Sequence, residues 1–506
     1  MEYWRRIFSP FGVANVVCVF FLLLSLWEVP AESIFVADNQ VKIQQAQAFL
    51  DSGFLSQYST CLELADFGGC AYTIGGEGRD VPILIGVFPV AFSLYAALVR
   101  LTGDYNHLIY ISFLFFLAGT WFISFRVRKD FWIPVVLTFG PCFFHSFLFP
   151  DYAIVFFLIA VLVGFYYRPL FGKYSNFMIG LVSGSAVFFR PEVVFLPFFL
   201  GLFSVIETFR SGLPARNTEE ERRFYLLIGF GSAVILFFGT NYALYENFLG
   251  TRIRANEEGI ESFLNWGKFV SLLFYGNSRI GFFLFSSWVL FALIYLSLRF
   301  RILSSKEKHL LLSVLLSIFV IVLLSPNDSN IDWGTRYLSW LTIPVAVLFF
   351  TSDFRQSSQD RRWKKFVIFL FILSLIVVFA FFRLQIKVAE EFQKYNSLLK
   401  GLSGEVSILT EPSILGFYGK DVLKKKVLLL RPSESRKEFV RFLSGKASRL
   451  ELVRYEPTTY FLLESIRPPH KKVENAYLLE KEFLDQGWKV SNKKISLKLE
   501  ILSLQR

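Results

Sequence analysis

Acidic and arginine side chains stand near the ends of long apolar runs in this sequence, and their chemistry suggests a function. Asp38 follows the apolar run Gly12–Trp27, and Asp151 lies between two later apolar runs. A carboxylate can accept the proton of an attacking hydroxyl group, whereas a guanidinium can hold a phosphate and stabilise the charge that develops on it. The pattern predicts transfer of a group from a phosphate-bearing lipid, with Asp38 and Asp151 as the catalytic candidates.

Further candidates lie in segments that we expect on the same side of a membrane as the two aspartates. Those that could bind the donor phosphate are Arg190, Arg252, Arg254 and Arg336. Those that could contact the rest of the substrate are Glu192, Trp333 and Tyr337. The prediction does not depend on any single residue. It depends on all of these residues lying on the same side of the membrane.

Each candidate also has a structural interpretation. Asp38 and Asp151 both precede helix-like segments, where an aspartate can cap the helix N-terminus. The arginines could anchor span ends or be solvated loop charges, and the aromatic residues could belong to an interfacial belt. His145, close to Asp151 in the sequence, is either a metal ligand or, as we favour, a structural histidine.

Composition places these residues in a polytopic membrane protein. The chain has 506 residues, a mean hydropathy of +0.48 and only 19% charged residues. Many of its apolar runs approach the length of about 17–25 residues that crosses hydrocarbon as a helix. The net charge of +12 is explained by membrane topology and anionic lipid, so we expect no nucleic-acid partner. The first apolar run has no small-residue cleavage site and is expected to stay as an anchor.

Clusters of Lys and Arg set the predicted topology, because such clusters favour the cytoplasmic side. About eleven spans are expected: residues 12–27, 107–125, 131–149, 152–167, 176–189, 193–209, 224–246, 280–298, 310–325, 337–350 and 366–382. The amino terminus is then cytoplasmic and the tail lies outside. For a bacterial inner-membrane protein, the tail would lie in the periplasm.

The run Pro82–Leu101 needs a separate interpretation. Counted as a full span, it would move every later basic cluster to the outside, against the charge rule. Pro82 and Pro89 and the polar stop Thr102–Asp104 suit an interfacial or re-entrant helix instead. An ordinary span with irregular loop charges is the alternative.

The expected fold is mainly α: a transmembrane helical bundle over residues 1–382, with its first external loop at 28–106, followed by a small extracytoplasmic α/β domain at 383–506. Strand-like runs alternate with helix-like ones in this tail, at Val406–Leu409, Val427–Leu430 and Leu450–Val453. Ser435 and Glu438 predict a capping box before a short helix.

Cys61 and Cys70 share the predicted first external loop. A disulfide between them is plausible in an oxidising compartment, but spacing alone cannot distinguish it from two free thiols. Cys18 and Cys142 fall in apolar runs and are expected to be inert packing residues.

The order of these elements resembles the GT-C superfamily of polytopic glycosyltransferases, which includes the protein O-mannosyltransferases and the lipid A aminoarabinose transferases. The resemblance covers about residues 10–350. The similar segments are Asp38 in the first external loop, Gly86–Gly103 with its interfacial-helix pattern, Phe149–Phe157 around Asp151, the glycine-rich Gly180–Pro191, and Trp333–Leu338 with Pro344.

The resemblance implies an inverting glycosyl transfer from a polyprenyl-phosphate sugar to an acceptor glycan, lipid or protein. Asp38 would be the general base, and Asp151 would orient the acceptor, the base or a cation. Arg336, with Arg190 or Arg252, would bind the donor phosphate. No cofactor is assigned with certainty, and a divalent metal is left open.

One departure from the family pattern affects this inference. Many relatives have Asp-Glu at the first site, where this chain has Asp38-Asn39, so a metal pair there is weakened and a non-catalytic assembly factor becomes an alternative. A transporter or lipid flippase is a further alternative, although we find no inverted repeat of the kind common in transporters. A surface-polysaccharide polymerase or ligase usually has its main external loop late, whereas the longest predicted loop between spans is the first here.

Overall fold

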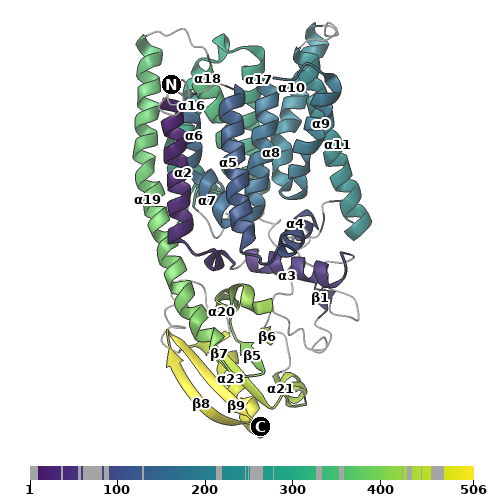
Figure 1. Ribbon diagram of the computed structural model, residues 1–506, viewed down its shortest axis with the longest axis vertical. Coiled ribbons are helices and arrows are strands. Elements are labelled where there is room, and N and C mark those ends of the chain that lie inside the picture. The colour runs from purple at the N-terminus through teal and green to yellow at the C-terminus, as the bar shows by residue number, and fades with distance from the viewer. Residues whose placement is uncertain are drawn as a thin grey trace. The chain divides into compact units, whose positions relative to one another are not determined.

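The computed structural model describes residues 10–35, 38–54, 59–60, 83–84, 90–127, 130–211, 219–245, 247–248, 250, 266–276, 279–325, 333–352, 358–423, 426–429, 436–445, 447–456 and 472–506. The chain forms two compact units (Figure 1). Met1–Glu28 and His107–Gln385 form one, which we call the helical unit. Val29–Asn106 and Ile386–Arg506 form the other, which we call the loop–tail unit.

Six helices among the described residues are long and apolar enough to cross a membrane. They are α2 (Pro10–Glu28), α5 (His107–Val127), α8 (Pro150–Tyr167), α11 (Glu219–Tyr245), α17 (Ser305–Leu324) and α19 (Ser358–Lys400). The mainly helical class and the presence of such helices are therefore confirmed, and they are consistent with a membrane protein. The expected total of about eleven spans stays a prediction.

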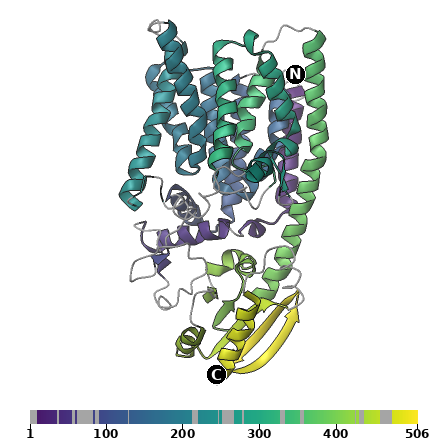
Figure 2. The ribbon, with the colours of Figure 1, turned by 180° about the vertical axis from the view of Figure 1, so that it is seen from behind.

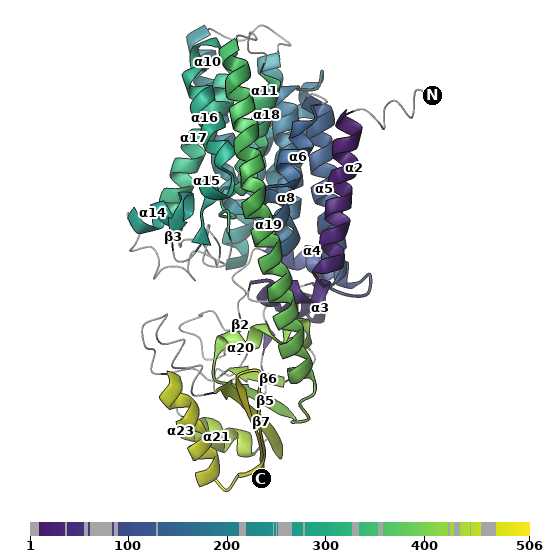
Figure 3. The same ribbon diagram turned by 90° about the vertical axis from the view of Figure 1, so that its left-hand side faces the viewer.

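Shorter helices fill the rest of the helical unit, where they lie alongside the long ones (Figures 1 and 3). They are α6 (Trp132–Thr138), α7 (Pro141–Leu148), α9 (Lys173–Gly184), α10 (Phe195–Ser211), α14 (Trp266–Leu273), α15 (Phe282–Phe285), α16 (Ser287–Leu298) and α18 (Thr342–Thr351). The 3₁₀ turns η3 (Ser185–Phe188), η4 (Pro191–Val194), η5 (Phe300–Ile302) and η6 (Ser339–Leu341) join several of them. A two-residue hairpin pairs β3 (Tyr275–Gly276) with β4 (Arg279–Ile280).

The segment 131–149, which we expected as one span, is not one continuous helix. The segment contains two helices, because α6 ends at Thr138 and α7 begins at Pro141. Proline has no backbone N–H to continue a helix, but it suits the first helical position. Gly140, which precedes it, is extended with φ −145° and ψ −178°. The break frees α7 to carry His145 into a buried polar cluster.

The helices α9 and α11 approach each other closely because glycines face the contact. A Cβ atom built on Gly229 would lie 2.0 Å from the carbonyl oxygen of Phe177, and one on Gly180 would lie 1.9 Å from that of Leu226. Small residues of this kind let helix backbones approach where lipid removes the hydrophobic driving force for packing. This contact fixes the helix that leads to η3 and Arg190.

We expect Gly229→Ala to destabilise the helical unit by about 1–3 kcal/mol, because the added methyl group would have to push a backbone carbonyl aside. A fall in the apparent melting temperature of the detergent-purified protein would measure this loss. Gly231→Ala is the matched control, since a Cβ there meets nothing within 4 Å. Equal melting temperatures for the two variants would contradict the close contact.

The loop–tail unit begins with η1 (Ala31–Ile34), α3 (Asp38–Asp51) and α4 (Val90–Arg100). The two-residue strands β1 (Ser59–Thr60) and β2 (Ile83–Leu84) pair antiparallel. The helix α4 has 11 residues. At 1.5 Å per residue it spans about 16 Å, roughly half the hydrocarbon thickness of about 30 Å. This length suits a helix that does not cross; Pro82 and Pro89 lie outside the described residues.

A small C-terminal sheet is present in the tail, with strand order β6-β5-β7-β9-β8 (Figure 2). Its strands are β5 (Val406–Leu409), β6 (Lys426–Leu429), β7 (Arg449–Tyr455), β8 (Lys489–Ser496) and β9 (Leu499–Gln505). The strand β5 is parallel to both β6 and β7, whereas β9 is antiparallel to β7 and β8. The predicted strand locations are confirmed for β5 and β7, and for β6 with a shift of one residue.

Helices cover both faces of the central strands. Phe439, from α21 (Arg436–Ser444), and Phe483, from α23 (Lys472–Asp485), belong to the apolar core on one face. On the other face, Leu399 of α19 packs with α20 (Pro412–Gly416) and η7 (Gly419–Leu423). The helix α19 continues without a break past the expected span end at Phe382, to Lys400. Of the predicted capping box, Ser435 and the Glu438 side chain lie outside the described residues.

Candidate functional site

A buried ionic cluster lies in the helical unit at the start of α8. The Asp151 side chain, in the first turn of this helix, forms an ion pair with Arg190, with 3.3 Å between the carboxylate and the guanidinium. Arg190 also pairs with Glu192 of η4 at 3.1 Å. Arg190 is 1% exposed and Asp151 is 3% exposed. Asp151 is not the N-cap of α8, which is Phe149, so its carboxylate belongs to the cluster and not to a cap.

Arg336 joins the same region from a sharp turn between α17 and η6. Gly334 and Thr335 both have positive φ, at 81° and 53°. A Cβ on Gly334 would lie 2.8 Å from that of Pro141, and the Thr335 hydroxyl donates to the carbonyl of Leu272 at 2.6 Å. The Arg336 guanidinium that follows lies 4.9 Å from the centre of the Phe149 ring.

Aromatic faces surround both guanidinium groups. Arg336 also lies over Tyr337, with 5.6 Å between its guanidinium carbon and the ring centre, and Arg190 lies at the same distance over Tyr152. The two guanidinium charges are close enough to repel each other. Cation–π contacts and the two carboxylates offset that repulsion in a buried setting. The structure therefore brings Asp151, Arg190, Arg336 and their neighbours Glu192 and Tyr337 into one part of the fold.

A chain of hydrogen bonds beneath this cluster fixes the turn that carries Arg336. The His145 Nε2 atom lies 3.1 Å from the carbonyl oxygen of Trp333, which can only accept, so we assign the ring hydrogen to Nε2. The Nδ1 atom then accepts from the Ser339 hydroxyl at 2.7 Å. Ser339 in turn accepts from the Tyr152 hydroxyl. Both ring nitrogens of His145 are therefore used in holding α7 to the turn.

These contacts favour the structural interpretation of His145. Within the ranges that the structure describes, no three His, Cys, Asp or Glu residues group as a metal site. Cys142 is buried, and its thiol lies 2.9 Å from the Ser339 carbonyl oxygen and 2.7 Å from the Thr342 hydroxyl. Sequence reasoning missed Ser339, Thr342 and Tyr152. One signal in the sequence could have found them. Each is a polar side chain in an apolar run, and each run follows a candidate residue, Asp151 or Arg336.

Of the remaining candidates, the structure describes the Trp333 side chain and only the backbone of Asp38. The Trp333 ring stacks on Phe381, with 5.3 Å between the ring centres. Arg252 and Arg254 lie outside the described residues, as do Cys61 and Cys70. The backbone of Asp38 begins α3 in the loop–tail unit, but its side chain is outside what the structure describes.

No family model and no curated protein matches the chain.

The chemistry of the cluster follows from its charges. Two guanidinium groups and two carboxylates lie together with little access to water, and such groups are costly inside a membrane bundle unless they are paired. Both carboxylates pair with Arg190, and its buried Nε atom has no hydrogen-bond partner among the residues that the structure describes. An anion that displaced one carboxylate would find a donor already in place.

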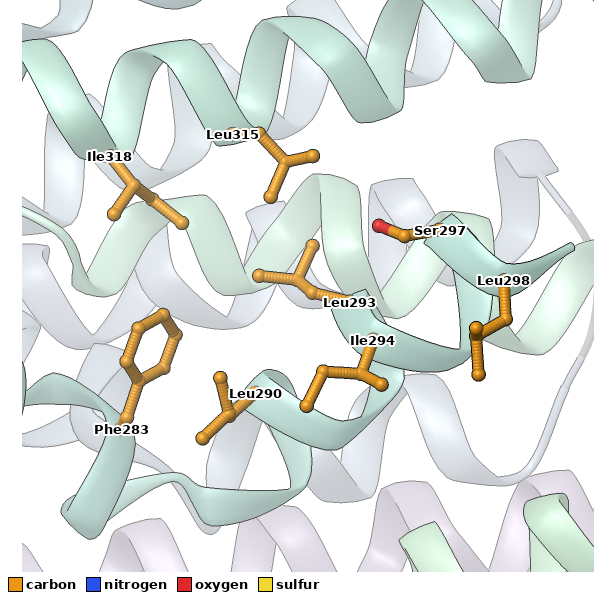
Figure 4. A pocket seen from close by; sticks show the side chains of 8 residues that line it. All are labelled: Phe283, Leu290, Leu293, Ile294, Ser297, Leu298, Leu315 and Ile318. Carbon is orange, nitrogen blue, oxygen red and sulfur yellow. The ribbon is translucent and has the colours of Figure 1, made fainter. Parts of the chain in front are cut away.

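An apolar pocket of about 510 Å³ lies between α15, α16 and α17 of the helical unit (Figure 4). Phe283 lies at one end, Leu298 at the other, and Leu293 and Leu315 face each other across it. Among the described residues that line it, Ser297 alone is polar. The pocket therefore suits a hydrocarbon chain.

In the loop–tail unit, ion pairs connect the described ends of the first loop to the tail. The Lys420 ammonium lies 2.8 Å from Asp104 and 3.5 Å from Glu32. Partial burial alone would raise the pKa of Asp104, but the hydrogen bond from Lys420 and nearby positive charge lower it below its usual value. A lowered pKa means that this pair contributes stability at neutral pH and loses it as the pH falls through the pKa of the folded state.

Proposed function

We propose that the protein is a membrane glycosyltransferase of the GT-C type. It would move a sugar from a polyprenyl-phosphate donor to an acceptor glycan, lipid or protein, with inversion at the sugar carbon. Asp38 would accept the proton of the attacking hydroxyl group as it bonds to that carbon, and the lipid phosphate would leave with the bonding electrons. The reaction would take place on the extracytoplasmic face of a bacterial inner membrane, with the C-terminal domain in the periplasm.

The observation that supports this proposal is the buried cluster of Asp151, Arg190, Glu192 and Arg336 among helices suited to a membrane. A bundle needs no such cluster for stability, because apolar side chains of similar size would pack there at lower cost. Ionisable residues within membrane segments usually mark a substrate path or a reaction site. A phosphate-linked lipid offers the anionic group that two neighbouring guanidinium groups suit.

The proposal assigns a role to each candidate residue. Arg336, with Arg190 and the loop residues Arg252 and Arg254, would bind the donor phosphate and stabilise it as a leaving group. Asp151 is the second catalytic candidate and would orient the acceptor, the base or a cation. Glu192, Trp333 and Tyr337 would contact the rest of the substrate. The proposal requires Asp38 to reach the same donor.

A non-catalytic assembly factor is the second candidate, and one observation favours it. Arg190 is neutralised by two carboxylates at 3.1 and 3.3 Å, as expected of a group that only holds helices together. Such a factor would bind lipid-linked sugar or a partner without transferring anything.

Lipid and glycan profiling of a deletion strain tests the proposal. A transferase predicts loss of one glycan product and accumulation of its polyprenyl-phosphate sugar. The purified protein in lipid nanodiscs should then transfer radiolabelled sugar from that lipid to the acceptor that the profile names. If the donor accumulates but the purified protein transfers nothing, the assembly factor is supported instead. An unchanged lipid and glycan profile would count against both.

A further inference from the structure

The tail segment Leu415–Asp421 accepts hydrogen bonds from α3, the helix that begins at Asp38. The Gln40 side-chain amide donates hydrogen bonds to the carbonyl oxygens of Leu415 and Gly419, at 2.9 and 3.0 Å. Gln40 is fully buried, and α3 packs against η7. A buried amide that makes two hydrogen bonds is costly to displace, because both carbonyls would lose their donor. The contact is made two residues after Asp38.

One lysine of the same segment holds the chain on both sides of α3. Lys420 pairs with Glu32, before α3, and with Asp104, after α4. The Lys420 side chain is 13% exposed, whereas those of Glu32 and Asp104 are 45% and 47% exposed, so solvent screens these pairs in part. Lys400 adds a second bridge, from Asp421 at 3.1 Å to Glu32 at 3.8 Å.

The segment is itself fixed to the end of α19. The Asn396 amide donates to the carbonyls of Phe417 and Tyr418, at 2.9 and 3.3 Å. Gly419 has φ +52°, and a Cβ there would lie 2.8 Å from the Phe392 ring. A glycine is therefore required for the segment to turn tightly against this helix. The segment Leu415–Asp421 therefore packs against α19 and also binds α3.

We propose that the tail segment Leu415–Asp421 positions Asp38 for catalysis, with Gln40 and Lys420 as positioning residues. This inference rests on the proposed function, in which Asp38 accepts a proton. Proton transfer requires the base within hydrogen-bond reach of the hydroxyl group, and a displacement of about 1 Å can cost roughly 10²-fold in rate. The tail is then a working part of the enzyme and not an appended domain.

A charge series at Lys420 tests the inference with the full-length protein in nanodiscs. Lys420→Glu should lower kcat, per mole of folded protein, by about tenfold or more, with the KM for the donor nearly unchanged. Lys420→Arg should keep the activity. Asp104→Lys combined with Lys420→Glu should recover part of it, because the ion pair with Asp104 is rebuilt in reverse while Glu32 still faces the new carboxylate. Lys394→Glu, on the exposed pair with Glu391, is the control and should behave as wild type.

Hydrogen–deuterium exchange gives a readout that does not depend on activity. Lys420→Glu should speed the exchange of backbone amides in α3 and leave those in α8 unchanged. If Lys420→Glu fails to fold, Gln40→Asn replaces it, since the shorter amide cannot reach both carbonyls, and the same losses are expected.

The outcomes separate this inference from the proposed function. Wild-type kcat and unchanged exchange in Lys420→Glu, with an inactive Asp38→Asn, would overturn the positioning role alone. Full activity of Asp38→Asn would overturn the proposed function, whatever the exchange of α3 shows.

Discussion

Asp38→Asn is expected to lower sugar transfer by about 10²–10⁴-fold, the usual contribution of a general base. Asparagine has nearly the same shape as aspartate but cannot take up the proton of the acceptor hydroxyl group. Transfer of radiolabelled sugar by the purified variant, at saturating donor and acceptor, measures the loss. Binding of the donor should change little, because the lipid phosphate is assigned to arginines.

Asp51→Asn is the matched control for this measurement. Asp51 is an exposed aspartate that ends the same helix, α3, so the substitution makes the same chemical change without touching the proposed base. Its activity should equal that of the wild type. Substantial transfer by Asp38→Asn would remove the catalytic assignment, whereas equal losses in both variants would point to a general effect on α3.

Arg190→Met is expected to destabilise the helical unit by about 3–5 kcal/mol, because it leaves Asp151 and Glu192 buried without their positive partner. The loss should appear as a lower yield from membranes and a lower melting temperature in detergent. Lys394→Met is the comparison. Lys394 pairs with Glu391 at 2.7 Å and both side chains are 54% exposed, so its loss should change the stability little, as is usual for solvated pairs.

A triple variant separates the stability of the cluster from its proposed role. Arg190→Met with Asp151→Asn and Glu192→Gln removes the unpaired charges and should recover much of the lost stability. The same variant should still fail to transfer sugar, because the phosphate ligand and the second carboxylate are gone. Wild-type transfer by the triple variant would place the reaction elsewhere. If Arg190→Met alone is as stable as the wild type, the two carboxylates tolerate the loss of Arg190.

Periodicity and the charge rule were sufficient for the coarse fold and for part of the site. Apolar run lengths identified the long helices, and short apolar, strand-like runs located β5 and β7. Grouping Asp151, Arg190, Glu192 and Arg336 required only the assumption that segments on one side of a helical bundle meet. Those four residues do meet in the helical unit.

Details that depend on long-range packing could not be obtained in this way. The contact between His145 and Ser339 joins residues 194 apart, and nothing local marks either partner. The break before Pro141 was visible as a Gly-Pro pair, but hydropathy averaged over a window concealed it. The helix α19 passes Phe382 because nothing in Arg383–Lys400 stops a helix, although the composition changes from apolar to charged.

The turn before Arg336 contains a residue in a strained conformation, and the same residue makes a buried hydrogen bond. Thr335 has φ +53°, a left-handed conformation that costs a residue with a branched Cβ about 1–2 kcal/mol relative to glycine. Glycine would relieve this strain. The substitution would also delete the hydroxyl group that reaches Leu272, and a hydrogen bond of this kind contributes about 0.5–1.5 kcal/mol. The two effects on stability oppose each other, so the hydrogen bond is what retains a strained threonine in the loop that presents the guanidinium.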